Sequence, residues 1–230
     1  MILSIHQPET FPQLGFFDKI LASDEFVFLD SVKYRKNYFQ NRNRIIVNGK
    51  ETWLTLPVGK SGYVINEKKF DLRVLSKIAK TLDQNFSRSE EKSVILHFLM
   101  NYRDENLANF NIDFIKTACK LLGIGMIFHK SSDLKLNSSK GYLILEICKS
   151  LESREYLSGA SGREYLDVKA FREENITLKF QKFFHQEYQI KGSCFVPYMS
   201  IILPLLTFGA SETLRLIQNG RGYESSEDNM

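Results

Sequence analysis

Two histidines in the sequence stand where an apolar run ends and a glutamine follows. His6 lies in the stretch IHQP, and His185 lies in FFHQEYQ. Imidazole titrates near neutral pH, so either side chain is suited to act as a general base, and Asp30, at the end of another apolar run, is suited to orient one of them. We therefore predict proton-transfer chemistry with His6, Gln7, His185 and Asp30 as the catalytic residues.

The stretch DSVKYRKNYFQNRNRI, residues 30–45, interleaves basic residues with aromatic ones. Guanidinium groups grip phosphate oxygens in pairs while aromatic rings cover a base, so this stretch is suited to hold a nucleotide or a nucleotide sugar. A solvated, positively charged loop that contacts nothing has the same composition. The candidate binding residues here are Tyr34, Lys36, Asn41, Arg42 and Arg44.

Arg42 is the residue of this stretch that we expect to contact phosphate, because a fixed, always-charged fork suits a diphosphate better than a lysine does. Alternation along a strand places Arg42 and Arg44 on one face and Asn41 and Asn43 on the other. An ion pair between Arg42 and an acid such as Asp30 is the alternative.

A third stretch, REYLSGASGREYLD at residues 154–167, is rich in small residues. Its backbone N–H groups are suited to cradle an anion, although the spacing matches neither the phosphate loop of NTPases nor GxGxxG. An ordinary strand-to-helix turn is the alternative. The candidate binding residues from this stretch are Tyr156, Ser158, Gly159, Arg163 and Tyr165, and Tyr188 and Gln189 join them from the second histidine segment.

Several function classes are disfavoured by what the sequence lacks. The patterns GxSxG, HExxH and the EF-hand are absent, and the three cysteines are far apart without CxxC spacing, which predicts reduced thiols and no metal site or bound cofactor. Basic and acidic residues are interspersed instead of forming blocks, and the net charge of +4 does not choose between a small anion and nucleic acid. The longest apolar run is too short to span a membrane, and no signal peptide precedes the first strand, so we expect a cytoplasmic protein.

The elements around these residues mostly alternate between strand and helix. Residues 1–5 are apolar enough for a short strand, Pro8 and Pro12 prevent regular structure after it, and helical spacing runs from Leu14 to Leu21. This order places His6 and Gln7 at the carboxyl end of the first strand. In an open α/β sheet that edge is where ligands bind.

Further strands are predicted at 24–30, 123–132 and 175–183, and a hairpin is predicted at 43–58 with Asn48-Gly49 as its turn. Residues 72–122 have the periodicity of three helices, 140–153 that of another, and 198–210 that of a buried helix. We therefore predict a single α/β domain over residues 1–220: a partly parallel sheet flanked by helices, with an antiparallel hairpin and a helical middle segment. Residues 221–230 are expected to be a frayed tail.

The order of several motifs resembles the WbqC-like protein family. The motifs are IHQP followed by GFFDKI, SDEFVFLDSVKYRKNYFQNRNRI, WLTLPV, YLSGASGREYLD, and a final F-H-x-x-Y-Q segment followed by F-x-P-x-x-S-I-I. The similarity runs from Ile2 to about Gly209. Family motifs map onto residues of this chain as follows: His6, Gln7, Pro8, Asp30, Tyr34, Asn41, Arg42, Tyr156, Ser158, Gly159, Tyr165, His185 and Tyr188.

The resemblance implies a cytoplasmic bacterial protein associated with O-antigen or other surface-polysaccharide sugars, with a proposed role in adding glycine or another acyl group to an amino sugar. The chain departs from the family pattern at one place. Where LSIIDLLFNxG is expected, it has MSIILPLLTFGA, so Leu203 and Thr207 replace an Asp and an Asn. If those polar groups orient substrate elsewhere, specificity or activity is altered here.

Taken together, these features give the hypothesis of an enzyme that acylates the amino group of a nucleotide-linked amino sugar. His6 or His185 is the base, Gln7 and Asn41 are donors to the oxyanion, and a clamp of three arginines, Arg42, Arg44 and Arg163, holds the diphosphate. The acyl donor is left open among a carrier-protein thioester, a coenzyme A thioester and an aminoacyl-tRNA. The expected partners are a nucleotide-linked sugar and either an acyl carrier protein or tRNA, with no membrane contact.

Two alternatives remain open. An HxxP element followed by a glycine and a helix faintly resembles the histidine signature of cytidylyltransferase-like enzymes, although Gly15-Phe16 stands where Gly-His is expected. The second alternative is a non-catalytic module that binds a nucleotide sugar or RNA through the loop rich in tyrosine and arginine.

Overall fold

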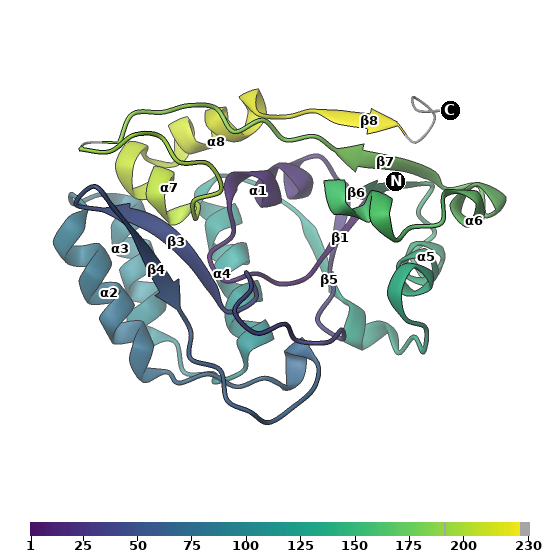
Figure 1. Ribbon diagram of the computed structural model, residues 1–230, viewed down its shortest axis with the longest axis horizontal. Coiled ribbons are helices and arrows are strands. Elements are labelled where there is room, and N and C mark those ends of the chain that lie inside the picture. Colours follow the sequence, from purple (N-terminus) through teal and green to yellow (C-terminus); the bar gives the residue numbers. More distant parts are fainter. Residues whose placement is uncertain (191, 226–230) are drawn as a thin grey trace.

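The computed structural model describes residues 1–190 and 192–225. A six-stranded sheet runs through it in the order β5–β2–β1–β6–β7–β8 (Figure 1). The first five are parallel and β8 pairs antiparallel with β7, so the predicted α/β class with a partly parallel sheet is confirmed. The strands span Ile2–His6 for β1, Glu25–Phe28 for β2, Ile127–Lys130 for β5, Glu155–Ser158 for β6, Thr177–Gln181 for β7 and Tyr223–Ser225 for β8.

Helices cover both faces of this sheet, and each face has its own apolar core. On one face Phe26 and Phe28 of β2 pack with residues of α1 (Leu14–Leu21) and α4 (Leu107–Leu121). On the other face Leu3 and Ile5 of β1 pack with residues of α5 (Lys140–Ser150) and α6 (Val168–Glu173). Because strand side chains alternate, one short strand supplies both cores. The sheet is doubly wound, and its order reverses between β1 and β6.

The helical middle segment contains α2 (Arg73–Asn85), α3 (Glu90–Asn101) and α4, as predicted. The predicted hairpin is also present, with β3 at Arg42–Val47 and β4 at Lys50–Thr55. Its turn places Asn48 and Gly49 at φ of 49° and 74°, the left-handed values that a two-residue hairpin turn of this type requires. A Cβ on Gly49 would lie 2.7 Å from the carbonyl oxygen of Gly192, so this position needs glycine for space as well.

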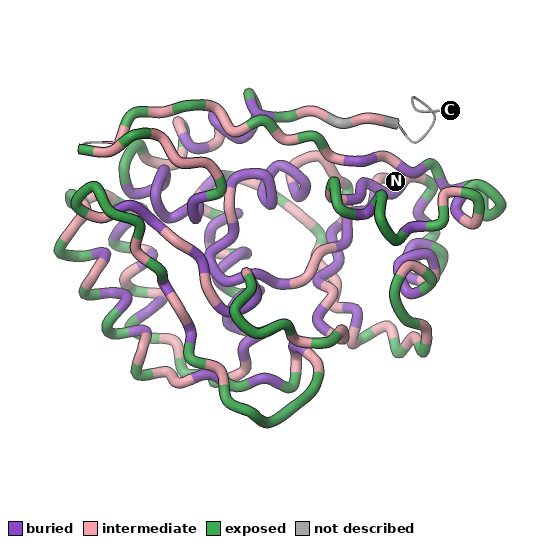
Figure 2. Tube along the Cα trace, viewed as in Figure 1, coloured by how far each residue is buried: buried purple, intermediate pink, exposed green. Residues whose placement is uncertain are grey.

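Two late helices follow, and α8 (Ala210–Asn219) packs on α1 while α7 (Ile202–Phe208) lies beside α8, against α3 and β3 (Figure 1). The buried helix predicted within 198–210 is therefore confirmed as α7. Its start is tied to α1 by a hydrogen bond from the N–H of Ile201 to the carbonyl of Pro12. As Figure 2 shows, α1 is buried on nearly all sides, because the sheet lies below it and α8 lies above it.

Two later segments confirm one sequence prediction and correct another. The strand-to-helix turn that the sequence offered as the reading of residues 154–167 is confirmed, because β6 ends at Ser158 and the 3-10 helix η3 (Ala160–Glu164) follows it. The strand β6 has no clear strand pattern in the sequence, because a strand of four residues is too short to show alternation. Residues 223–225 of the expected frayed tail form β8, and 226–230 lie outside the described residues. In the described part of the chain, no helix is both long and apolar enough to cross a membrane.

Candidate functional site

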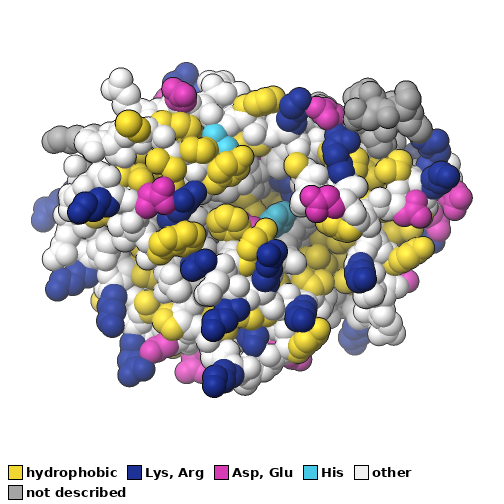
Figure 3. Space-filling view, viewed as in Figure 1, with side chains coloured by type: hydrophobic (Ala, Val, Ile, Leu, Met, Phe, Trp, Pro, Cys, Tyr) yellow, Lys and Arg dark blue, Asp and Glu magenta, His cyan; other side chains and the backbone are white. Residues whose placement is uncertain are grey.

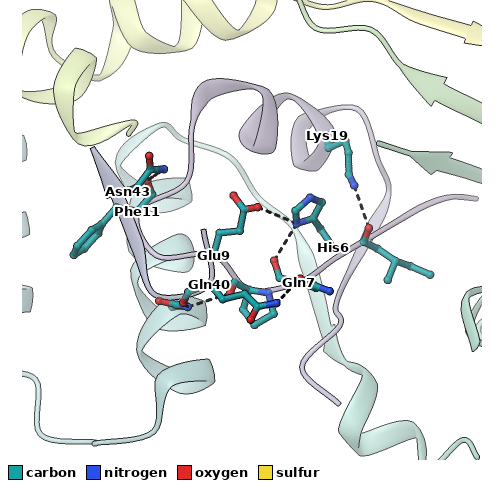
Figure 4. A network of polar contacts seen from close by, with 10 residues as sticks. His6, Gln7, Glu9, Phe11, Lys19, Gln40 and Asn43 are labelled. Carbon is teal, nitrogen blue, oxygen red and sulfur yellow. Dashed lines mark hydrogen bonds and ion pairs between the residues drawn. The ribbon is translucent and has the colours of Figure 1, made fainter. Parts of the chain in front are cut away.

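His6 is the last residue of β1, and strand alternation turns it toward α1. Its ring meets the ring of Phe16 edge-on, with centroids 5.0 Å apart. Its Nδ1 lies 3.0 Å from the carbonyl oxygen of Gln7, which can only accept, so we assign the proton to Nδ1. The other nitrogen, Nε2, then carries a lone pair and points away from Gln7 in Figure 4.

Two ionisable side chains, those of Lys19 and Glu9, are buried beside His6. The Nζ of Lys19, on α1, donates to the carbonyl oxygen of Ile5 at 3.1 Å, and only 2% of the residue is exposed. Glu9 is 8% exposed, and its Oε1 lies 3.9 Å from Nδ1 of His6 (Figure 4). We call His6, Glu9 and Lys19 the β1-edge cluster. Figure 3 shows that the molecular surface is hollowed near the centre of this face, with a histidine beside the hollow.

Burial moves all three of these groups toward their uncharged forms. Desolvation, with the charge of Lys19 second, lowers the pKa of His6 to about 3, although its hydrogen bond to Gln7 raises it. The imidazole is therefore neutral at pH 7, although 34% of the His6 side chain is exposed. Desolvation raises the pKa of Glu9 to about 8 and lowers that of Lys19 to about 7, and each partner's charge opposes the shift of the other.

A network of amides fixes the loop that follows His6. The Nε2 of Gln40 donates to Oε1 of Gln7 at 2.6 Å, and Oε1 of Gln40 accepts from the N–H of Arg35. From α4, the Nδ2 of Asn111 donates to the carbonyl oxygens of Pro8 and Gln40. Gln7 is therefore held in place by the predicted basic loop and by a helix a hundred residues later.

The backbone that follows β6 lies beside the β1-edge cluster. A Cβ added to Gly159 would lie 3.9 Å from Nζ of Lys19, so the backbone after β6 lies beside the buried amine. Tyr156 and Ser158 face the opposite way, because alternation turns them toward the α5 and α6 side. Tyr156 stacks on Phe171 there, and Ser158 packs against Gly162. Of the candidates from this stretch, Gly159 is therefore the one beside the cluster.

The other two predicted catalytic residues contact different partners. The carboxylate of Asp30 accepts hydrogen bonds from Ser131 and Ser132 of the 3-10 helix η2 (Ser131–Leu134), rather than from a histidine. The ring of His185 contacts those of Phe183 and Tyr198, with centroids 5.0 and 4.4 Å away, and burial lowers its pKa to about 4.

The two histidines contact different residues near the start of α1. Phe183 packs over Gly15, whereas His6 contacts Phe16, and among the described residues no contact joins the histidines. Tyr188, near His185, packs against Phe195 and Phe208, and burial raises its pKa to about 12, while Gln189 is exposed. These contacts do not test whether the two strand ends meet over one cleft, and that meeting stays a prediction.

The predicted arginine clamp is divided between two parts of the molecule. Arg42 and Arg44 lie on one face of the hairpin and Asn41 and Asn43 are buried on the other, so the predicted alternation is confirmed. Both guanidinium groups lie over the ring of Trp53, at 4.5 and 5.8 Å from its centroid.

Arg163 instead lies over the ring of Phe180 and pairs with Glu224, at the β7–β8 edge. The described contacts therefore do not bring it to Arg42 and Arg44. Nor do they pair Arg42 with Asp30, because its Nη2 donates to the carbonyl oxygen of Asn37.

The remaining candidates have varied surroundings. The Nδ2 of Asn41 donates to the carbonyl oxygen of Leu56, and its Oδ1 is buried without a partner among the described residues. Tyr34 is half-buried beneath Lys68, and Lys36 and Tyr165 are exposed. At the two departures from the family pattern, Leu203 is buried in the core, and the hydroxyl of Thr207 donates a hydrogen bond to the carbonyl oxygen of Leu203.

Sequence reasoning missed Glu9 and Lys19. The available signal was the composition of α1, LGFFDKIL, which is apolar on nearly every side. A lysine in such a helix is buried once both sides are covered. The site therefore holds an amine, a carboxyl group and an imidazole that are all uncharged or half-charged near neutral pH, which suits general acid–base catalysis.

Comparisons with known proteins agree with this description of the chain. A protein of Mycobacterium tuberculosis named uncharacterized protein Rv1507c is 30% identical over 217 residues, which cover 90% of this chain and 94% of that protein. No solved structure matches the chain. Residues 7–214, which include most of the β1-edge cluster and the whole hairpin, match the WbqC-like protein family, and the chain therefore belongs to that family.

Proposed function

We propose that this protein transfers an acyl group to the amino group of a nucleotide-linked amino sugar, and that the β1-edge cluster carries the proton transfers. The observation that supports this most is the burial of Glu9 and Lys19 beside His6 at the carboxyl edge of the sheet. Acids and bases with pKa values near 7 are what such a reaction needs. The amino sugar itself comes from the family resemblance.

In the proposed reaction, the uncharged amine of Lys19 takes a proton from the ammonium group of the sugar. The freed nitrogen attacks the acyl carbon, a C–N bond forms, and the bond from that carbon to the donor's sulfur or oxygen breaks. Glu9, protonated at neutral pH, gives its proton to the leaving group. The nitrogen of the new C–N bond then passes its second proton to the carboxylate of Glu9, and Lys19 releases its proton to water. The starting state is thereby restored, with one proton released overall.

His6 and Gln7 have orienting roles in this proposal. With Nδ1 bonded to the carbonyl of Gln7, the free Nε2 of His6 accepts a hydrogen bond from an N–H or O–H of the sugar. Gln7 has its Oε1 engaged by Gln40, which leaves its NH₂ group to donate to the oxyanion. The nucleotide part lies where the strand order reverses between β1 and β6, the place at which doubly wound sheets bind nucleotides.

A mass-spectrometric assay tests the proposal. Purified protein is incubated with nucleotide-linked amino sugars and with the three donor classes, and a gain of the acyl mass on the sugar is expected. Lys19→Met should abolish that gain while the sugar still binds by calorimetry. If the wild type never modifies an amino group, or if Lys19→Met is fully active, acyl transfer at this cluster is excluded.

Nucleotidyl transfer is the second candidate, and the strand order with His6 at the reversal point favours it. The start of α1 does not. The Oε1 of Gln13 already accepts from the N–H of Gly15 at 2.6 Å, so the first turn of this helix is capped by its own chain. Release of pyrophosphate from CTP or ATP with magnesium and a sugar phosphate would establish this second activity in place of acyl transfer.

A further inference from the structure

A second region of the molecule combines exposed rings with exposed positive charge. Residues 33–69 contain nine Lys and Arg against two Glu, an excess larger than the +4 of the whole chain. The rest of the protein is therefore net acidic, and the positive charge is concentrated here. We call this region the basic aromatic surface, and its members are Lys33, Arg35, Lys36, Tyr38, Arg42, Arg44, Trp53 and Tyr63.

Cations and rings alternate on this surface. The guanidinium of Arg35 lies 4.5 Å from the ring centre of Tyr38, and the Nζ of Lys33 lies 5.4 Å from that of Tyr63. Trp53 carries the two hairpin arginines on its ring and is still 45% exposed. Tyr38 and Tyr63 are 39% and 64% exposed. Figure 3 shows Lys and Arg spread among hydrophobic side chains over the lower middle of the face, below the hollow.

Most of this charge is not neutralised by the protein. Among the described residues, Arg44 is the one member with a carboxylate partner, Glu51 at 2.6 Å. Holding unpaired cations together costs stability through mutual repulsion, so such a cluster suggests an anionic partner. The rings of Tyr38, Trp53 and Tyr63 are also exposed to solvent, so their apolar faces are free to contact a ligand.

We propose that the basic aromatic surface binds a single-stranded polynucleotide. Its rings stack successive bases, and its lysines and arginines follow the phosphates. A base-paired duplex is disfavoured, because its bases are not free to stack on exposed rings. An anionic membrane is disfavoured as well, since membrane-surface binding uses a large aliphatic face, whereas the exposed large side chains here are tyrosine and tryptophan.

This surface is hydrogen-bonded to the loop that follows His6. The side chain of Gln40 accepts from the backbone of Arg35 and donates to Gln7, and the carbonyl of Phe39 accepts from the N–H of Thr10. A strand of bases on the surface therefore ends beside Gln7. Resting on the proposed function, we infer that the acyl donor is carried on the unpaired 3′ end of an RNA, which selects aminoacyl-tRNA among the three donor classes.

The sequence contains one tryptophan, Trp53, so tryptophan emission, excited at a wavelength that the ten tyrosines do not absorb, reports on this surface alone. Titration with a twelve-residue oligouridylate should quench it, since stacking of a base on indole quenches emission. Oligothymidylate of the same length separates RNA from DNA, and a self-complementary duplex tests the need for unpaired bases. The logarithm of affinity should fall linearly with that of salt, with a slope of roughly 0.7 per phosphate contacted.

Matched variants locate the binding by anisotropy of a labelled oligouridylate. Trp53→Ala should weaken affinity by roughly ten- to a hundredfold, since it removes one stacking partner, whereas Trp53→Phe should retain most of it. Lys36→Glu should weaken affinity and lower the salt slope by roughly 0.7. Lys169→Glu, on exposed α6 at the other end of the molecule, makes the same charge change and should have no effect.

Each outcome bears on the proposal. Absence of oligonucleotide binding at low salt, equal weakening by Lys36→Glu and Lys169→Glu, or binding to phosphatidylglycerol vesicles alone would overturn it. Binding that favours oligothymidylate would retain the surface and remove the RNA-linked donor. Lys19→Met separates the two proposals, because it should bind oligouridylate normally. Loss of acyl transfer in Lys19→Met tests the proposed enzyme activity and not the surface. Loss of oligouridylate binding in Trp53→Ala tests the surface and not the enzyme activity.

Discussion

Lys19 and Arg42 are both cations close to the same loop, yet the protein treats them in opposite ways. Lys19 projects from α1 onto β1 and is buried there, where desolvation lowers its pKa to about 7 and holds it partly uncharged. Arg42 lies half-buried on the outer face of the hairpin, where its guanidinium lies over the ring of Trp53.

The difference separates chemistry from binding. A buried group that can lose its charge exchanges protons near neutral pH, and it does so at a cost in stability. An exposed group that keeps its charge attracts anions and affects stability little. Substitutions at the β1-edge cluster should therefore change rate, pH dependence and stability together, whereas those on the basic aromatic surface should change affinity alone.

The largest effect is expected from Lys19→Met. Loss of the base should reduce transfer by roughly two to four orders of magnitude. The same change should raise the free energy of unfolding at pH 7 by about 2 kcal/mol, because folding of the wild type removes the charge of Lys19 from water or removes its proton, and methionine has neither cost. Loss of the hydrogen bond to Ile5 offsets part of the gain.

The pH dependence of this stabilisation gives a check on its cause. Between pH 7 and about 10.5 the unfolded lysine still binds a proton that the folded one has lost, so wild-type stability rises with pH in that window. The stability advantage of the Lys19→Met variant over the wild type should shrink accordingly when urea unfolding is measured at pH 7 and at pH 10. Destabilisation of the variant at pH 7 would instead mean that Lys19 is a structural charge.

Glu9→Gln should have the next largest effect, about a hundredfold on the rate. Wild-type activity should rise as Lys19 loses its proton near pH 7 and fall as Glu9 loses its proton near pH 8. Glutamine cannot ionise, so the alkaline fall should be absent from the pH–rate profile of the variant. A profile that keeps this fall would exclude Glu9 as the acid.

The stability of Glu9→Gln should also follow the raised pKa. From pH 4.5 to 8 the unfolded carboxyl group is ionised while the folded one keeps its proton, so wild-type stability falls over this window relative to the variant. Equal unfolding free energies near pH 4 and a more stable variant at pH 8 are the expected result. A constant difference at both pH values would show that the carboxyl group is not buried in its neutral form.

A smaller effect, about a tenfold loss of oligouridylate affinity, is expected for Arg42→Lys. Lysine keeps the charge but loses the planar group that stacks on Trp53 and pairs with phosphate. The melting temperature should be unchanged, because Arg42 has no carboxylate partner among the described residues. A lower melting temperature with unaltered affinity would assign Arg42 a structural role.

The smallest effect is expected for Arg163→Gln. Its guanidinium already pairs with Glu224, and solvent and salt screen an exposed pair of this kind, so it contributes little to stability. Binding of a nucleotide sugar, measured by calorimetry, should change by less than about twofold, since the pair lies at the β7–β8 edge. A loss of tenfold or more would place Arg163 in the site with the hairpin arginines.

Local sequence was sufficient where a short-range rule determines the structure. Proline after β1 and apolar spacing from Leu14 predicted α1 with its observed bounds, and Asn48-Gly49 predicted the turn of the hairpin. Alternation also assigned Arg42 and Arg44 to one face. Each of these rules acts within a few residues, so no knowledge of the rest of the chain is needed.

The partners of the predicted site residues depended on distant segments. Asp30 is engaged by Ser131 and Ser132, and Arg163 by Glu224. Gly159 reaches Lys19 only because β6 returns to pair with β1 after an excursion of about 150 residues. Contacts over such separations leave no periodic signal in a single sequence.

The sequence by itself determined that His6 and Gln7 end the first strand and that rings and cations alternate before the hairpin. The tertiary structure alone decided that Glu9 and Lys19 are buried with His6, since α8 and the sheet cover α1 from opposite sides. Helical periodicity fixes where a side chain points, whereas its pKa depends on how much water the surrounding elements exclude. The reactive groups are therefore ordinary residues until the fold desolvates them.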